Sequence, residues 1–158
     1  SVELYSLTKG YSMAGWRVGF AVGNADAVAA VTKLKSYIDY GTFQPIQIAS
    51  TVALNELDDY PFELSAVYKE RRELVVEHLE DLDFNVQESD ATMFVWAKLP
   101  EKFNKDSLRF SLDILEKSNV AVSPGVGFGK FGEGYIRIAL VENKQRIRQA
   151  MKNIKAAL

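Results

Sequence analysis

The sequence predicts an α/β chain in two parts, in which residues 1–58 are the tail of a larger α/β domain and residues 59–158 form a small α+β domain. From Tyr60 onward the predicted order is helix, strand, strand, helix, strand, strand, helix, which is a compact unit in itself. The chain opens directly in a predicted strand and without an initiator methionine. We therefore expect a fragment whose missing N-terminal part pairs with this strand edge.

The first part is predicted to contain two strands and two helices. Apolar residues spaced three and four apart indicate the first helix, and Gly41 ends it as glycine often ends helices. Pro45 lacks a backbone N–H and disfavours helix at Gln44, so a loop is expected around it. The predicted elements are strands over 2–9 and 16–23, a helix over 26–40, a loop over 42–47 and a helix over 46–57.

The second part is predicted from caps and from apolar periodicity. Pro61 suits the first turn of a long helix, and Asp106 can cap a later one. Ile147, Met151 and Ile154 form one stripe of an amphipathic C-terminal helix. The predicted elements are helices over 58–82, 107–118 and 144–158 and strands over 84–87, 93–98, 120–123 and 135–141.

Composition excludes several classes of function. The chain is 47% hydrophobic and 25% charged, and its net charge of −2 gives no general attraction to nucleic acid or to an anionic membrane. It contains no cysteine, which excludes disulfides and thiolate metal sites. No apolar run approaches the roughly 20 residues that span a bilayer. We expect a cytoplasmic protein without a metal site and without a nucleic-acid or membrane partner.

Three features look like functional motifs but are interpreted as structural. Gly127, Gly129 and Gly132 match the dinucleotide pattern G-x-G-x-x-G, but a strand rather than a helix is predicted to follow them. His78 is the single histidine and has no cysteine partners for a metal. The charged run 69–73 is expected to be a solvated helix face with ion pairs worth about 0.3–0.5 kcal/mol each.

Lys9 and Arg17 lie eight residues apart around a glycine-punctuated turn. A desolvated lysine amine can lose its proton and attack an aldehyde to form a Schiff base. The planar fork of Arg17 suits a phosphate, and Ser6 can donate a further hydrogen bond. An aldehyde beside a phosphate describes pyridoxal 5′-phosphate. From these residues alone, an exposed Lys9 with a structural Arg17 is the alternative.

Three stretches of the sequence, read together, form an ordered set of motifs. Ser6 to Lys9 reads S-x-x-K, and W-R-x-G follows at Trp16 to Gly19. The stretches "YGTFQPIQIAS" and "VSPGVGFGKFGEGYIRIAL" come later in the same order. Together they resemble the fold-type I pyridoxal-phosphate-dependent aminotransferases of class I and II over essentially the whole chain. The resemblance implies a C-terminal fragment of that fold, with a three-layer α/β/α remnant, a small C-terminal α+β domain and pyridoxal 5′-phosphate as cofactor.

The resemblance also implies roles for four residues. Lys9 would bind the cofactor as a Schiff base and move the substrate proton, while Ser6 and Arg17 would hold the cofactor phosphate. Arg137 would bind the α-carboxylate of the substrate.

The pattern around Arg137 supports a buried partner for it. Strand alternation puts Tyr135, Arg137 and Ala139 on one face, opposite three apolar residues. A charged fork in so apolar a strand is costly unless it is paired. A substrate carboxylate is one partner, and a buried Asp or Glu is the alternative.

Within this family, the residues of the motifs resemble those of the alanine (glutamate–pyruvate) aminotransferase branch. The aspartate and LL-diaminopimelate aminotransferases are the alternatives. The resemblance implies amino-acid and 2-oxo-acid substrates and a homodimer, with residues 42–47 near the dimer contact. In this family the aspartate that pairs with the pyridinium nitrogen lies well before the lysine in the sequence, and therefore outside this chain. We therefore expect the isolated 158 residues to be inactive.

Two rival interpretations stay open. A β- or γ-lyase or an acyl-CoA-dependent synthase has the same fold, although the Trp16-Arg17 pair fits aminotransferases better. A non-catalytic regulatory domain of aminotransferase-like fold is the alternative from another class.

Overall fold

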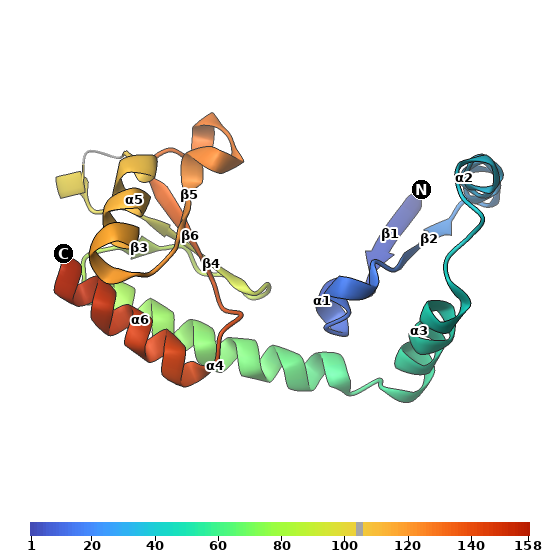
Figure 1. Cartoon of the computed structure of the whole chain (residues 1–158), viewed down its shortest axis with the longest axis horizontal. Coiled ribbons are helices and arrows are strands. Elements are labelled where there is room, and N and C mark those ends of the chain that lie inside the picture. Colours follow the sequence, from blue (N-terminus) through green and yellow to red (C-terminus); the bar gives the residue numbers. More distant parts are fainter. Residues whose placement is uncertain (104–105) are drawn as a thin grey trace. The chain divides into compact units, whose positions relative to one another are not determined.

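A computed structural model describes residues 1–103 and 106–158 (Figure 1). The chain divides into two compact units, Ser1–Leu64 and Ser65–Leu158, which are called the first and the second unit below. That they belong to a larger and a smaller domain stays a prediction. No helix among the described residues is long and apolar enough to cross a membrane.

The first unit pairs two short strands and adds helices to them. β1 and β2 are antiparallel, with Val2 opposite Gly23 and Ser6 opposite Gly19. A 3-10 turn over Ala14–Trp16 lies between α1 and β2. The elements are β1 (Val2–Ser6), α1 (Leu7–Gly10), β2 (Gly19–Gly23), α2 (Ala25–Ile38) and α3 (Gln44–Glu56).

Two predicted strand boundaries in this unit are wrong. The strand expected over 2–9 ends at Ser6, because the Ser6 side chain accepts a hydrogen bond from the backbone N–H of Thr8 at 3.2 Å and caps α1. Lys9 therefore lies on a helical turn rather than at a strand end. The strand expected over 16–23 begins only at Gly19, because Arg17 adopts a left-handed backbone with φ 51°.

The two longer helices of this unit are confirmed, but α2 ends at Ile38 with Asp39 as its cap, before the Gly41 that was expected to end it. α2 begins after Asn24, whose side chain accepts from the backbone N–H of Ala27. α3 begins at Gln44 rather than at residue 46, with Pro45 in its first turn. A proline is tolerated there because the first turn has no use for its missing N–H. The loop predicted over 42–47 is therefore only partly confirmed.

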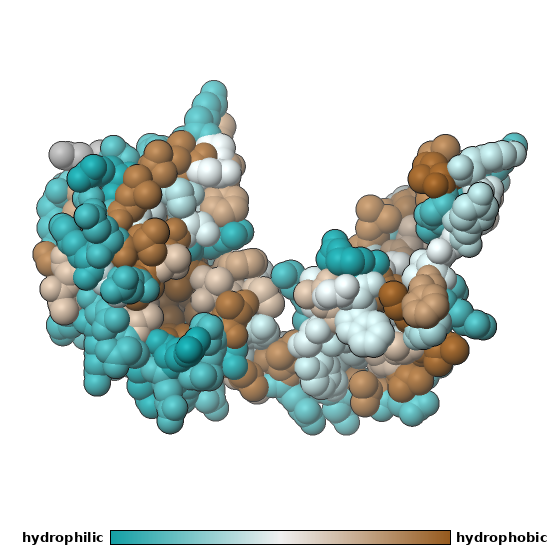
Figure 2. Space-filling model, viewed as in Figure 1, coloured by the Kyte–Doolittle hydropathy of each residue, from teal (hydrophilic) through white to brown (hydrophobic). Residues whose placement is uncertain are grey.

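The core of the first unit is small. Leu7, Met13 and Ala53 are its buried apolar residues, and no residue of α2 is buried among the described residues. Leu34 and Ile38 are exposed apolar residues of α2. Figure 2 shows brown, hydrophobic patches on the surface of this unit. The described residues therefore leave much of the apolar surface of this unit uncovered.

The second unit is one antiparallel sheet with helices packed against it. The strand order is β3-β4-β6-β5, with Trp96 opposite Arg137 and Ser123 opposite Arg137 on its other side. The predicted order of elements is confirmed. The helix α4 (Tyr60–Glu80) begins in the first unit and continues into the second. The other elements are β3 (Asn85–Val86), β4 (Phe94–Lys98), α5 (Ser107–Ser118), β5 (Ser123–Pro124), β6 (Tyr135–Ala139) and α6 (Lys144–Ala157).

The two faces of this sheet differ in chemistry. Ile136 and Ile138 are buried on one face, together with apolar residues of three helices, among them Leu79, Ile114 and Met151. The other face carries half-buried aromatic rings from β4 and β6 around Arg137. The alternation predicted for the strand 135–141 is thus confirmed. The apolar face of the sheet packs against the helices and forms the core, whereas the aromatic face lies outside this core.

The glycine-rich connection from β5 to β6 is held together at its base. It makes two 3-10 turns, Gly125–Phe128 and Lys130–Gly132, and the strand β6 follows, as predicted. A Cβ on Gly132 would lie 2.1 Å from the carbonyl oxygen of Gly125. Only glycine permits so close an approach of two backbones.

We expect Gly132→Ala to lower the free energy of unfolding of the complete protein by about 1–3 kcal/mol, because backbone must move to admit the methyl group. Gly127→Ala is the matched control, since a Cβ there meets no atom within 4 Å. Denaturant unfolding of both variants measures the difference. Equal stabilities would show that the approach of the two backbones does not constrain the loop.

Candidate active site

Lys9 and Arg17 belong to one hydrogen-bonded turn of the first unit. The backbone N–H groups of Tyr11 and Met13 both donate to the carbonyl of Leu7, at 3.1 and 3.3 Å. The N–H of Leu7 in turn donates to the carbonyl of Val18 at 3.3 Å. Because Leu7 is fully buried, these bonds tie the turn to the small core. The structure therefore brings the predicted lysine and arginine onto one compact segment.

The side chain of Lys9 is exposed, and it has no hydrogen bond or ion pair with any residue that the structure describes. The described residues therefore do not desolvate its amine. The hydroxyl of Ser6 accepts from Thr8, which leaves its own proton available to donate. One terminal nitrogen of Arg17 donates to the carbonyl of Ala14 at 3.1 Å, and the rest of this exposed guanidinium is open.

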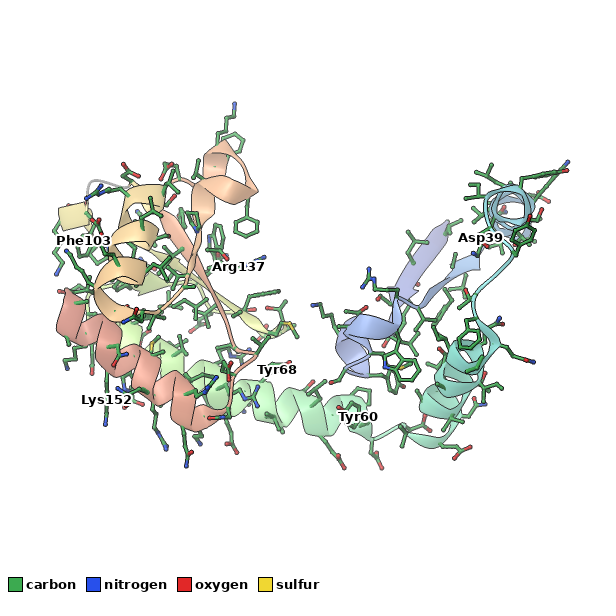
Figure 3. All side chains as sticks on the ribbon, viewed as in Figure 1. Asp39, Tyr60, Tyr68, Phe103, Arg137 and Lys152 are labelled. Carbon is green, nitrogen blue, oxygen red and sulfur yellow. The ribbon has the colours of Figure 1, made fainter. Side chains whose placement is uncertain are left out.

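Arg137 lies on the aromatic face of the second unit (Figure 3). Its guanidinium carbon is 4.2 Å from the ring centroid of Phe94 and 4.1 Å from that of Phe128. Its Nε is buried without a hydrogen-bond partner among the residues described. The four ion pairs found in the described part of the chain involve other residues. The described chain thus supplies no Asp or Glu to neutralise Arg137.

Sequence reasoning missed the two phenylalanines beside Arg137. Phe94 had a signal, because alternation in "MFVWAK" puts Phe94 and Trp96 on one face of a strand that pairs with β6. Phe128 had none, since its place depends on the fold of the glycine-rich loop. Trp96 joins this group, with its ring 5.7 Å from Phe128 and stacked at 5.5 Å on Tyr135.

Glu133 was also missed, and it ties this loop to α5. Its carboxylate accepts from the backbone N–H of Ser107 at 2.7 Å and from that of Gly134 at 3.0 Å. The hydroxyl of Ser107 accepts from the N–H of Val126 at 3.2 Å. The backbone N–H of Ser107, followed by that of Gly134, lowers the pKa of Glu133 from its ordinary value.

We expect the stabilising effect of Glu133 to depend on pH. Because its pKa is lowered in the folded state, its contribution is complete above about pH 5, where the unfolded carboxyl is ionised. The contribution is lost as the pH falls through the folded pKa. Thermal unfolding of the complete protein and of Glu133→Gln should differ at pH 7, and the difference should shrink as the pH falls through the lowered pKa of Glu133.

Glu116→Gln is the matched control, because it removes a carboxylate from an exposed position on α5. A difference between wild type and Glu133→Gln that stays constant from pH 7 to pH 3 would contradict the role of the ionised carboxylate.

His78, which was interpreted as structural, contacts the backbone of its own helix. Its Nδ1 lies 2.8 Å from the carbonyl oxygen of Leu74 within α4. The prediction of ion pairs within the run 69–73 is wrong. Arg71 donates to the carbonyl of Leu140 at 2.8 Å, and Glu70 pairs with Lys144 of α6 at 3.1 Å. Tertiary partners have replaced the helical ones.

The turn of the first unit carries an amine and a guanidinium, and the aromatic face of the second unit carries an arginine without a carboxylate partner among the described residues. Groups of these kinds can bind anions. Residues 1–154 match the family of class I and II aminotransferases. The chain belongs to this family, which confirms the resemblance seen in the sequence.

Individual relatives support the same family. The chain is 54% identical to AatC of Rhizobium meliloti over 159 residues, covering 100% of this chain and 39% of the relative. It is 47% identical over 154 residues to the LL-diaminopimelate aminotransferase of Natranaerobius thermophilus, covering 98% and 39%. It is 45% identical over 157 residues to the glutamate-pyruvate aminotransferase AlaC of Escherichia coli, covering 99% and 38%.

A solved structure confirms the fold class. Substrate-bound BacF from Bacillus subtilis matches with a TM-score of 0.92 and 34% identity, over 98% of this chain and 39% of that chain. The chain thus spans about 39% of the length of the relatives that it matches.

The residues present fit pyridoxal 5′-phosphate, on which this family depends. Lys9 offers an amine without a partner among the described side chains, and an aldehyde requires such a nucleophile. Arg17 and Ser6 offer open donors of the kind that a phosphate accepts. The side chains of this one segment therefore suit both the aldehyde and the phosphate of the cofactor.

Proposed function

We propose that the complete protein is a pyridoxal-phosphate-dependent aminotransferase that moves an amino group between an amino acid and a 2-oxo acid. Membership of the family supports the class of reaction. The structural observation that carries the substrate class is the guanidinium of Arg137, which has no carboxylate partner in the described chain. An α-carboxylate is common to both substrates and would supply that partner.

The residues of the first unit would hold the cofactor. Lys9 would bind it covalently, and the same Nζ would carry the proton that leaves and returns to the substrate α-carbon. Arg17 and Ser6 would hold the phosphate through charge-assisted and neutral hydrogen bonds. The bound cofactor supplies an electron sink that makes the α-proton acidic.

Arg137 would bind the substrate carboxylate through two parallel N–H donors. The aromatic rings beside it exclude water from part of the guanidinium, which strengthens the interaction with an anion. Because neither ring accepts a strong hydrogen bond, the N–H donors stay available for the ligand.

For the amino donor we propose alanine or glutamate with pyruvate or 2-oxoglutarate as the acceptor. The similarity to a glutamate-pyruvate aminotransferase supports this choice. A similarity of the same order to an LL-diaminopimelate aminotransferase makes that diamine the second candidate. We further propose a cytoplasmic homodimer with residues 42–47 near its contact, which the exposed side chain of Phe43 supports.

The test is a panel of donors with the complete, cofactor-loaded protein. We expect amino transfer from L-alanine and L-glutamate to exceed that from L-aspartate and LL-diaminopimelate. Preference for the diamine would replace the proposed substrate. Absence of transfer from every donor, with the cofactor bound, would favour a non-catalytic domain of this fold.

A further inference from the structure

We propose that Phe128 is a positioning residue for Arg137: its ring holds the guanidinium so that the N–H edge is presented to a carboxylate. The inference rests on the proposed function, because it concerns how the carboxylate-binding residue is held. Phe94 provides the second ring. Phe94 lies on β4 and Arg137 on the neighbouring strand β6, whereas Phe128 reaches the guanidinium from the loop between β5 and β6.

The distances support direct contact of the guanidinium with both rings. The guanidinium carbon lies 4.1 Å from the centroid of Phe128 and 4.2 Å from that of Phe94. The electron-rich face of a benzene ring attracts a cation, and this attraction leaves the N–H donors in the guanidinium plane unoccupied. A carboxylate neighbour would also stabilise the charge, but it would take up the same donors as the substrate. Two rings therefore stabilise Arg137 without competing with its ligand.

The loop that carries Phe128 is built to hold one conformation. The N–H of Gly129 donates to the carbonyl of Val126 at 3.0 Å, directly around the ring's attachment point. The base of the loop is closed by the contact between Gly125 and Gly132 and by the bonds of Glu133. A loop fixed in this way can place one side chain accurately.

Phe128 is not explained as a core residue. Its side chain is 51% exposed, and the hydrophobic core lies on the other face of the sheet. Among the described residues it contacts Arg137 and also Trp96, which meets it edge to face at 5.7 Å. Both of these contacts are made on the aromatic face of the sheet.

The same loop offers a matched control. Phe131 is 89% exposed, and the cation above its ring is its neighbour Lys130, at 5.0 Å. Phe131→Leu therefore removes the same atoms from the same loop without touching Arg137.

The test measures carboxylate binding directly, so it does not depend on turnover. The complete, cofactor-loaded protein is titrated with propionate by ligand-observed NMR, with propionamide as the neutral comparison. We expect Phe128→Leu to weaken propionate binding about tenfold, a size consistent with loss of a partly desolvated cation–π contact. Phe128→Tyr should restore it, and Phe131→Leu should match wild type. In an Arg137→Ala background, Phe128→Leu should have no further effect.

The results separate this inference from the proposed function. Unchanged propionate affinity in a folded Phe128→Leu protein would overturn the inference, as would equal loss in Phe131→Leu. Failure of the wild type to prefer propionate over propionamide would also overturn it. Propionate binding with the expected pattern of variants, but no amino transfer from any donor, would support the inference and contradict the proposed function.

Discussion

Replacing Lys9 with alanine in the complete, cofactor-loaded protein is expected to lower the rate of amino transfer by about 10⁴-fold or more, because a proton-transfer group alone contributes about 10²–10⁴ and Lys9 would also hold the cofactor. The absorbance band of the lysine-bound cofactor should disappear in the same variant. Steady-state kinetics and an absorbance spectrum measure the two effects.

Two variants control for loss of charge. Lys9→Arg keeps a cation at this position but lacks a nucleophilic amine at neutral pH, so it should be as inactive as the alanine variant. Lys33→Ala removes a lysine from an exposed position on α2 and should leave the rate near wild type. A Lys9→Ala protein that retains wild-type activity would contradict the assignment.

Replacing Arg137 with alanine is expected to lower kcat/KM for amino acids by about 10²–10³-fold, because truncating one partner of a buried, hydrogen-bonded charge pair costs about 2–5 kcal/mol. Arg137→Lys should recover only part of this loss, since an ammonium cannot form the two parallel bonds of the planar fork. Kinetics with alanine and with ethylamine, which lacks the carboxylate, separate the two contributions.

Arg146→Ala is the matched control for this prediction. Arg146 forms an exposed pair with Glu142 at 3.3 Å on the same unit, so its removal should change kcat/KM little. An equal loss for alanine and ethylamine in Arg137→Ala would contradict carboxylate binding, because the amine has no group for Arg137 to bind.

Elements with strong local signals could be predicted almost residue by residue. The helix expected over 107–118 is observed as Ser107–Ser118. Asp106 caps it through the backbone N–H of Arg109 at 2.8 Å, and Asn119 ends it in a left-handed conformation. Such end signals act within a few residues, which is why the sequence alone reveals them.

Elements that depend on one side chain or on distant contacts could not be predicted as well. A strand was expected over residues 2–9, but the hydrogen bond from the N–H of Thr8 to the Ser6 side chain caps a helix that begins at Leu7. The short strand expected over 120–123 is observed at Ser123–Pro124, where pairing with β6 decides its position. Local propensity is overridden there by the neighbouring strand.

The candidate site could likewise be predicted only in part. Alternation alone placed Arg137 on the face opposite Ile136 and Ile138, and the structure confirms this. Its surroundings were left open between a substrate and a buried acid. The approach of Phe128 depends on the contact between Gly125 and Gly132, which no local pattern reveals.

The central claim is that the amine of Lys9 carries the cofactor, and chemical trapping tests it most directly. The complete protein is incubated with pyridoxal 5′-phosphate, reduced with borohydride, digested and mapped by mass spectrometry. The account predicts the phosphopyridoxyl group on the peptide that contains Lys9. Its attachment to another lysine, or its absence from a protein that is active in amino transfer, would contradict the account.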